Sequence, residues 1–127
     1  MFTEEITHEQ RQERGQLEQA LINLAVNARD AMPGDGRLTL GVRPFGPGII
    51  EISVRDSGTG IPVELRERIF EPIFTTKAHG FGSGLGLPMV RGFTAAAGGV
   101  VTVESELGIG TTFYICLPEV PEGAPDR

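Results

Sequence analysis

The first regular pattern along the chain is helical. Apolar residues recur at steps of three and four between positions 17 and 32, and Pro33 and Gly34 follow. At about 100° per residue this spacing forms one face, so it predicts a helix over 17–32. The members of that face are Leu17, Leu21, Leu24, Ala25, Ala28 and Met32. The charged residues 1–16 are interpreted as an N-terminal extension, compatible with part of a first strand or of a helix.

Shorter apolar runs predict strands over 37–42, 49–54, 100–104 and 111–117. The glycine-containing loops 44–48 and 107–110 would join them into two hairpins. A short helix is predicted over 62–69, and a second long helix over 85–97, ended by two glycines. The order helix, hairpin, helix, hairpin predicts an α+β fold: a two-layer sandwich with a mixed, mostly antiparallel sheet covered on one face by helices.

Composition narrows the class of protein. With 127 residues, 39% hydrophobic and 22% charged, the chain suits one globular domain, which we place at 17–118, with a tail or linker at 119–127. A net charge of −6 argues against nucleic acid as a partner. No apolar run approaches the ~20 residues of a membrane span, so no direct membrane contact is expected. With a lone Cys116, the segment fits the cytoplasm, although a parent protein could be membrane-anchored.

A glycine-rich loop precedes the second long helix. The run Gly82-Ser83-Gly84-Leu85-Gly86-Leu87 follows Lys77 by a few residues. A helix N-terminus with nearby glycines and a cation suits phosphate groups, and the same glycines could form a plain flexible turn. The spacing matches neither the dinucleotide fingerprint nor the P-loop. The segment 74–83 is predicted to form a lid over a polyphosphate.

Polar residues also mark the first helix. Asn23, Asn27 and Asp30 form a narrow stripe roughly opposite the apolar face, with apolar neighbours on both sides. A solvated face is the plain alternative. Buried amides need partners, however, and Asn27 could give its carbonyl oxygen to Mg²⁺, which prefers hard oxygen ligands shared with substrate phosphates.

Asp56 ends the second predicted strand and enters a turn with Gly58 and Gly60. It could be an ordinary turn residue beside glycines that supply positive φ angles. A recessed carboxylate beside two positions without side chains would also make a slot for a flat ring whose amino group donates to the acid. Adenine fits that slot.

Together these motifs resemble the ATP-binding catalytic domain of sensor histidine kinases, in the superfamily that also holds gyrase, heat-shock ninety-type chaperones and mismatch-repair ATPases. Residues 17–32 resemble the asparagine box, 56–60 the first glycine box, 69–77 the phenylalanine box and 82–87 the second glycine box. Residues 108–113 are similar to the closing strand of the family. The resemblance covers about 16–118 and implies the Bergerat-type ATP-binding fold.

The resemblance also implies roles. Asn27 would ligate Mg²⁺, and Asn23 would lie near the phosphates. Asp56 would bind the adenine amino group with Thr111 beside it, and Lys77 would meet the distal phosphates. The implied catalytic set is Asn23, Asn27 and Lys77. The implied ATP-contacting set is Asn27, Asp30, Asp56, Gly58, Gly60, Ile61, Phe74, Lys77, Gly82, Ser83, Gly84, Leu85, Gly86, Leu87 and Thr111. Asp30 departs from the family, in which many histidine kinases carry a basic residue.

The residue one turn before Asn27 bears on the reaction. In the hydrolases and anti-sigma serine kinases of the superfamily, this position resembles a glutamate acting as general base. Here it is Asn23, and an amide cannot take a proton at neutral pH. A phosphoacceptor histidine brings its own nucleophilic nitrogen. The expected reaction is therefore transfer of the γ-phosphoryl group of Mg-ATP to a histidine on a dimerisation hairpin, with a response regulator downstream.

The acceptor itself is not found in the sequence. His8-Glu9 resembles the start of an acceptor motif, but the usual proline does not follow, so we interpret it as an exposed polar segment. Two rival classes stay open. One is a stand-alone anti-sigma-type serine kinase, which the length suits and Asn23 disfavours. The other is a non-catalytic module that binds nucleotide or protein without chemistry.

Overall fold

The computed structural model describes residues 8–71 and 86–119. Two helices, four strands and one short 3-10 turn follow the predicted order. They are α1 (His8–Asp30), β1 (Leu38–Pro44), β2 (Ile49–Asp56), η1 (Val63–Leu65), α2 (Gly86–Ala96), β3 (Val100–Glu106) and β4 (Gly110–Pro118). Within the described ranges, neither helix is long and apolar enough to cross a bilayer.

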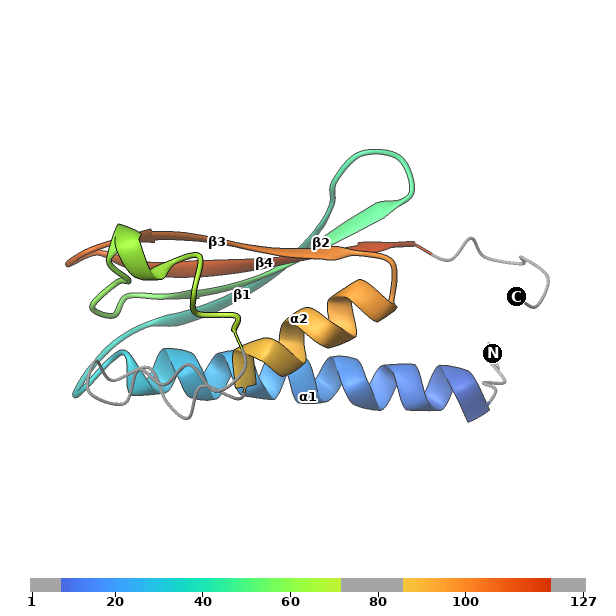
Figure 1. The fold of residues 1–127 in the computed structure, drawn as a ribbon, viewed down its shortest axis with the longest axis horizontal. Coiled ribbons are helices and arrows are strands. Elements are labelled where there is room, and N and C mark those ends of the chain that lie inside the picture. Colours follow the sequence, from blue (N-terminus) through green and yellow to red (C-terminus); the bar gives the residue numbers. More distant parts are fainter. Residues whose placement is uncertain (1–7, 72–85, 120–127) are drawn as a thin grey trace, which may run out of the picture.

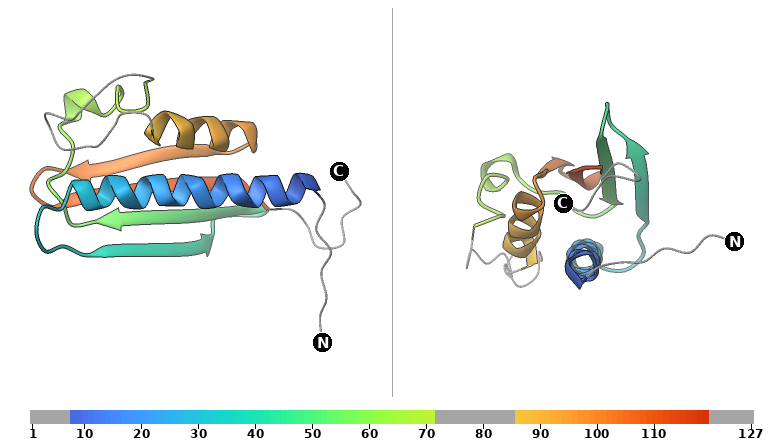
Figure 2. Two further views of the ribbon diagram at one scale, coloured as in Figure 1. Left: turned by 90° about the horizontal axis from the view of Figure 1, so that it is seen from below. Right: turned by 90° about the vertical axis from the view of Figure 1, so that its right-hand side faces the viewer.

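The strands form one sheet in the order β1-β2-β4-β3, and each described pair is antiparallel. Helices α1 and α2 lie side by side on one face of this sheet (Figure 1 and Figure 2). The predicted α+β two-layer architecture is therefore confirmed. The register sets Asp56 of β2 opposite Thr111 of β4, and Thr111 opposite Ser105 of β3.

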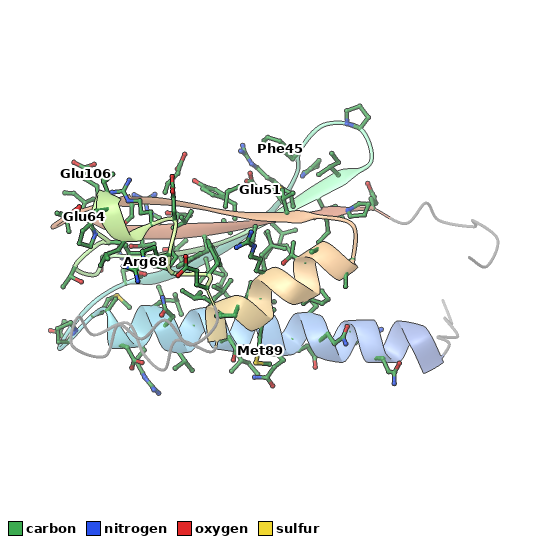
Figure 3. All side chains as sticks on the ribbon, viewed as in Figure 1. Phe45, Glu51, Glu64, Arg68, Met89 and Glu106 are labelled. Atoms are coloured by element: carbon green, nitrogen blue, oxygen red, sulfur yellow. The ribbon has the colours of Figure 1, made fainter. Side chains whose placement is uncertain are left out.

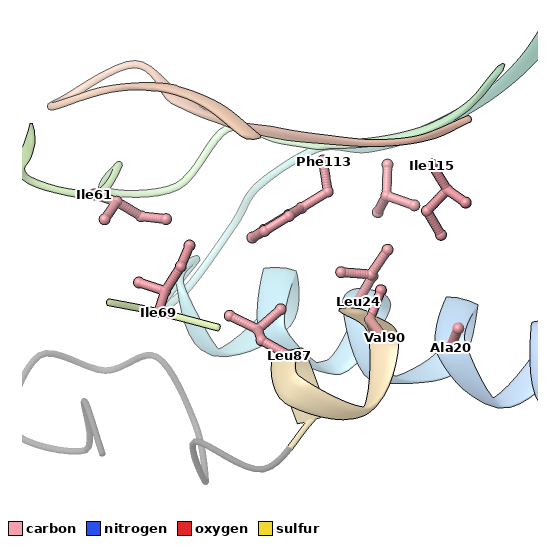
Figure 4. Packing of buried hydrophobic residues seen from close by; sticks show 9 residues of the cluster. Ala20, Leu24, Ile61, Ile69, Leu87, Val90, Phe113 and Ile115 are labelled. Carbon is pink, nitrogen blue, oxygen red and sulfur yellow. The ribbon is translucent and has the colours of Figure 1, made fainter. Parts of the chain in front are cut away.

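The core fills the space between the sheet and the helices (Figure 4). On β4, every second residue is buried, which matches the alternation of a strand with one covered face. The ring of Phe113 packs edge to face with Phe70, at 6.1 Å between centroids and 87° between planes. The buried apolar cluster consists of Ala20, Leu24, Val54, Ile61, Ile69, Leu87, Val90, Phe113 and Ile115.

Helix α1 begins earlier than the sequence pattern predicts. It starts at His8, not at Leu17, and ends at Asp30, two residues before Met32. The segment 9–14 contains Glu, Gln and Arg and no proline. These are strong helix formers, so the helix can continue without an apolar face. The prediction from apolar spacing alone missed this part, and the N-terminal extension adopts the helical alternative over residues 8–16.

The predicted helix over 62–69 is wrong in type. Only Val63–Leu65 form a 3-10 turn, followed by further turns held by i→i+3 hydrogen bonds. In this segment the fully buried side chains are Ile61 and Ile69, one at each end. Leu65 lies four residues from each of them and packs against the core, so α-helical spacing is present. The backbone nevertheless closes the segment with i→i+3 bonds, and short 3-10 turns are common in such connections.

Candidate functional site

Asp56 is a recessed acid at the end of a central strand. Its exposed fraction is 4%. One carboxylate oxygen, Oδ1, accepts the backbone N–H of Gly58 at 2.8 Å and the backbone N–H of Thr111 at 3.3 Å. The other oxygen, Oδ2, has no hydrogen-bond partner among the described residues. The carboxylate is therefore held in place by one oxygen and keeps the other for an external donor.

Burial shapes the acidity of this group. Removal from water raises the pKa of Asp56 above its ordinary value, and the N–H groups of Gly58 and Thr111 partly oppose that rise. The two backbone bonds stabilise the ionised form because they are made to the charge itself. The Asp56 carboxylate is thus a buried acceptor whose Oδ2 has no hydrogen-bond partner among the described residues.

The loop after Asp56 is fixed on both sides. The N–H of Thr59 donates to the carbonyl oxygen of Ala31 at 3.1 Å, and the N–H of Gly108 donates to the carbonyl oxygen of Thr59 at 2.9 Å. A Cβ at Gly58 would collide with the carbonyl oxygen of Ala31, and Gly60 has φ of +82°. Only glycine fits both positions. The loop is consequently pinned between the end of α1 and the β3–β4 hairpin.

The two asparagines of α1 lie within reach of the same region. Asn27 is one turn before Ala31, on which the Asp56 loop packs, and its exposed fraction is 8%. Its side chain makes no hydrogen bond within the described residues. Asn23 lies one turn earlier. Its Oδ1 accepts from Gln19 at 3.1 Å, whereas its Nδ2 is buried without a partner among residues 8–71 and 86–119.

The start of α2 packs against Asn23. A Cβ added at Gly86, the first residue of α2, would lie 3.4 Å from Cβ of Asn23 and 3.9 Å from its Nδ2. The predicted helix start is therefore confirmed to within one residue. The first N–H groups of a helix lack intrahelical partners and carry partial positive charge. An unpaired amide donor and a helix N-terminus thus adjoin each other.

Other predicted residues have different surroundings. Asp30 is 32% exposed at its side chain and lies 3.6 Å from Nε of Arg29. Ile61 and Leu87 belong to the apolar core, so their side chains serve packing. Six predicted positions lie outside the described residues: Phe74, Lys77, Gly82, Ser83, Gly84 and Leu85.

Sequence reasoning missed Ser105. Its Oγ accepts the N–H of Ile61 at 2.7 Å, donates to the carbonyl oxygen of Gly110 at 3.2 Å and lies 2.7 Å from Oγ1 of Thr111. The available sequence signal was a polar residue among the inward-facing positions of β3, after Val101 and Val103.

The buried Asp56 on a central strand thus lies beside the end of α1, which carries the buried Asn27 and the partly buried Asn23. Residues 12–121 match the family model for the histidine kinase-, DNA gyrase B-, and HSP90-like ATPase. The chain belongs to this family.

Curated proteins with similar sequences include sensor kinases. The sensor kinase CckA of Brucella abortus is 47% identical over 85% of this chain and 13% of CckA. The sensor histidine kinase ZraS of Klebsiella oxytoca is 42% identical over 80% of this chain and 22% of ZraS. The chain thus spans less than a quarter of either relative.

Two solved structures illustrate the shared fold. The catalytic domain of histidine kinase ThkA has a TM-score of 0.74 and 36% identity, over 85% of this chain and 70% of that one. Full-length ShkA in complex with AMPPNP has a TM-score of 0.76 and 38% identity, over 89% of this chain and 23% of that one. The shared fold is that of histidine kinase catalytic domains.

Proposed function

We propose that this chain is the ATP-binding catalytic domain of a two-component sensor histidine kinase. It binds Mg-ATP and transfers the γ-phosphoryl group to a histidine on a dimerisation hairpin, from which a response regulator takes it. The observation that carries the proposal is the placement of Asp56, with one unused carboxylate oxygen, beside the end of a helix that holds two incompletely bonded asparagines. ATP as donor places the domain in the cytoplasm.

The base end of the nucleotide belongs at Asp56. Oδ2 accepts a hydrogen of the 6-amino group of adenine, while Oδ1 stays bonded to the backbone. Gly58 and Gly60 leave room for the flat ring because they carry no side chain. An acid that cannot turn away selects a ring with an amino donor at this position.

The phosphate end belongs at Asn23, Asn27 and the start of α2. The Nδ2 of Asn23 is a buried donor with no partner in the part of the chain that the structure describes, and a phosphate oxygen would satisfy it. The carbonyl oxygen of Asn27 suits Mg²⁺, and no group of three or more His, Cys, Asp or Glu in the described ranges could hold a metal by itself. When bound, Mg²⁺ neutralises charge on the phosphates. Lys77 and the 82–87 loop are proposed to complete this end.

Neither asparagine can act as a base, so the domain contributes position and charge. The acceptor imidazole nitrogen attacks the γ-phosphorus, the bond to the bridging oxygen breaks, and ADP leaves. The relative named as a sensor histidine kinase and the structure of a histidine kinase catalytic domain support this assignment over a serine kinase, and the AMPPNP complex of ShkA supports nucleotide binding.

The acceptor hairpin must approach beside Asn23. A pocket of about 220 Å³ between α1 and α2 is lined by Asn23, Gln16, Gln19, Ala20, Met89 and Phe93. Met89 is 56% exposed and lies on α2 on the side turned away from the sheet (Figure 3). We assign this pocket as the place where an apolar side chain of the hairpin docks.

The test is a transfer assay with γ-labelled ATP, the chain and candidate histidine hairpins. The expected product is a labelled hairpin whose label is lost in acid and retained in base, as phosphohistidine requires. Asn27→Ala, which removes the proposed metal ligand, is the negative control. Acid-stable label on a serine would favour the serine kinase class, and ATP binding without transfer to any hairpin would favour a binding module.

A further inference from the structure

Ser105 joins three parts of the molecule that approach the proposed base site. Across the sheet, Ser105, Thr111 and Asp56 lie in register on neighbouring strands β3, β4 and β2. The Ser105 hydroxyl also accepts the N–H of Ile61, which follows the glycine loop. One side chain therefore links the loop, the β3–β4 hairpin and the residue beside the acid.

The hydrogen bonds of the Ser105 hydroxyl determine how the Thr111 hydroxyl is oriented. A serine hydroxyl has one proton and two acceptor positions. The N–H of Ile61, at 2.7 Å, uses one acceptor position, and the Ser105 proton is donated to the carbonyl oxygen of Gly110 at 3.2 Å. The second acceptor position therefore takes the proton of the Thr111 hydroxyl, and the Thr111 oxygen keeps a lone pair for another donor. Thr111 is 4% exposed, and its hydroxyl has Ser105, at 2.7 Å, as its single partner among the described residues. Ser105 is thus the described group that fixes the direction of the Thr111 hydroxyl.

We propose that Ser105 is a positioning residue for adenine recognition. Resting on the proposed function, this assigns Asp56 to the 6-amino group and the Thr111 hydroxyl oxygen to the adjacent ring nitrogen N1 through one water, which donates to both atoms. Ser105 does not touch the base. It holds the Thr111 oxygen beside the acid, so that the two groups match neighbouring atoms of one ring edge.

A nucleotide with an altered base distinguishes this positioning role from a purely structural role, because only the positioning role affects the preference between the two bases. In 1-deaza-ATP, a carbon replaces N1, so the nucleotide keeps the amino group and loses the acceptor. We expect the 127-residue chain to bind ATP about threefold to tenfold more tightly than 1-deaza-ATP, the range of one neutral hydrogen bond. Calorimetry with excess Mg²⁺ measures both affinities.

Ser105→Ala should abolish most of that preference. The variant should bind ATP about threefold to tenfold more weakly, and its affinity for 1-deaza-ATP should change less than about twofold. Thr111→Val should have the same selective effect, which covers the case in which Ser105→Ala does not fold. Ser53→Ala removes a strand hydroxyl from the opposite face of the sheet, and it should leave the preference unchanged.

Equal weakening of both nucleotides in Ser105→Ala and Thr111→Val would overturn the inference and leave Ser105 a purely structural residue. That result differs from failure of the proposed function. If the unaltered chain bound neither nucleotide, the assignment as an ATP-binding domain would fall instead.

Discussion

The two ends of the proposed nucleotide site differ in how fully their polar groups are bonded. At the base end, Asp56 and the glycine loop are connected through backbone N–H groups and Ser105. At the phosphate end, Asn27 has no side-chain hydrogen bond within the described residues, and the Nδ2 of Asn23 is buried without a partner. The base end is formed before ligand binds, whereas the phosphate end holds groups that need one.

This difference has an energetic consequence. A buried donor without a partner costs about 1–3 kcal/mol. Asn23 carries such a donor on a helix whose neighbouring positions Ala20 and Leu24 are core residues. An apolar residue would stabilise the free domain better, so the amide marks binding rather than folding. The preformed base end lowers the ordering that binding requires.

The largest effect is expected from Asn27→Ala. Loss of the ligand oxygen should abolish the Mg²⁺ dependence of ATP binding and lower phosphotransfer by at least about 100-fold, because charge neutralisation of the phosphates is the main contribution of the domain. Calorimetry with and without Mg²⁺ measures the first effect, and the hairpin assay measures the second. Gln12→Ala, at an exposed amide of the same helix, is the control. Normal Mg²⁺ dependence in Asn27→Ala would place the metal ligand elsewhere.

Asp56→Asn should weaken ATP binding by about tenfold to 100-fold, since a hydrogen bond to a charged group is worth about 1.5–3 kcal/mol. The amide oxygen can still accept from Gly58 and Thr111, so the loop should stay in place. Titration calorimetry gives the affinity, and a circular dichroism spectrum checks the fold. Unchanged affinity would remove the acid from the base site.

A smaller effect on phosphotransfer is expected from Met89→Asp. A charge in the pocket between α1 and α2 should lower phosphotransfer to the hairpin about tenfold, because burying an unpaired carboxylate opposes docking. Because Asn23 lines the same pocket, the new charge can also repel the phosphates, so transfer is compared at saturating ATP and calorimetry measures any loss of ATP affinity separately. Ala95→Asp adds the same charge at an exposed position of α2 and should transfer normally. Equal rates for both variants would mean that the hairpin docks elsewhere.

Local patterns were enough to predict much of this architecture. The alternation of buried residues on β4 and the apolar spacing of Leu17–Met32 depend on neighbours along the chain, so the strands and the body of α1 follow from the sequence. The start of α1 at His8 was missed because residues 8–16 have no apolar periodicity of their own. The 3-10 turn after Pro62 was predicted as an α-helix because Ile61, Leu65 and Ile69 share α-helical spacing.

The polar arrangement needed three-dimensional information. Asp56 and Thr111 were predicted to be neighbours from the family resemblance, and the sheet register confirms it. The contact between Asn23 and Gly86 depends on how α1 and α2 pack. Ser105 binds Ile61 across 44 residues, and a single serine in a strand gives no sign of that. The roles of Lys77 and the 82–87 loop stay predictions.

Asn23→Leu tests the phosphate end through its effect on the stability of the free domain. Removing the unpaired Nδ2 should raise the free energy of unfolding by about 1 kcal/mol without nucleotide and weaken ATP binding a few-fold. The bond from the exposed Gln19 side chain adds little and is lost as well. Denaturant unfolding measures stability, with Ala20→Val as a purely apolar change on the same helix. A less stable Asn23→Leu domain would show that the amide serves folding.

The smallest effect concerns the charge at the base end. The pKa of Asp56 is raised from 3.8 in the folded domain, mainly by burial. A raised folded-state pKa means that the stability linked to the protonated form is complete below the unfolded pKa and is lost as pH rises through the folded value. Asp56→Asn should therefore melt higher than the unaltered chain near neutral pH, and that gain should vanish in acid.

Parallel melting curves of the two chains, without nucleotide, from about pH 3.5 to 7 give this difference directly. Asp35→Asn removes one negative charge at an exposed position after α1 and corrects for the net charge of the chain. One outcome is that the melting temperature of Asp56→Asn rises more than that of Asp35→Asn, by a difference that grows with pH. This result would show that the ionised Asp56 destabilises the free domain, even though its Oδ1 is hydrogen-bonded. A difference independent of pH would mean that Gly58 and Thr111 compensate the burial fully, and the two ends would then differ only in hydrogen bonding.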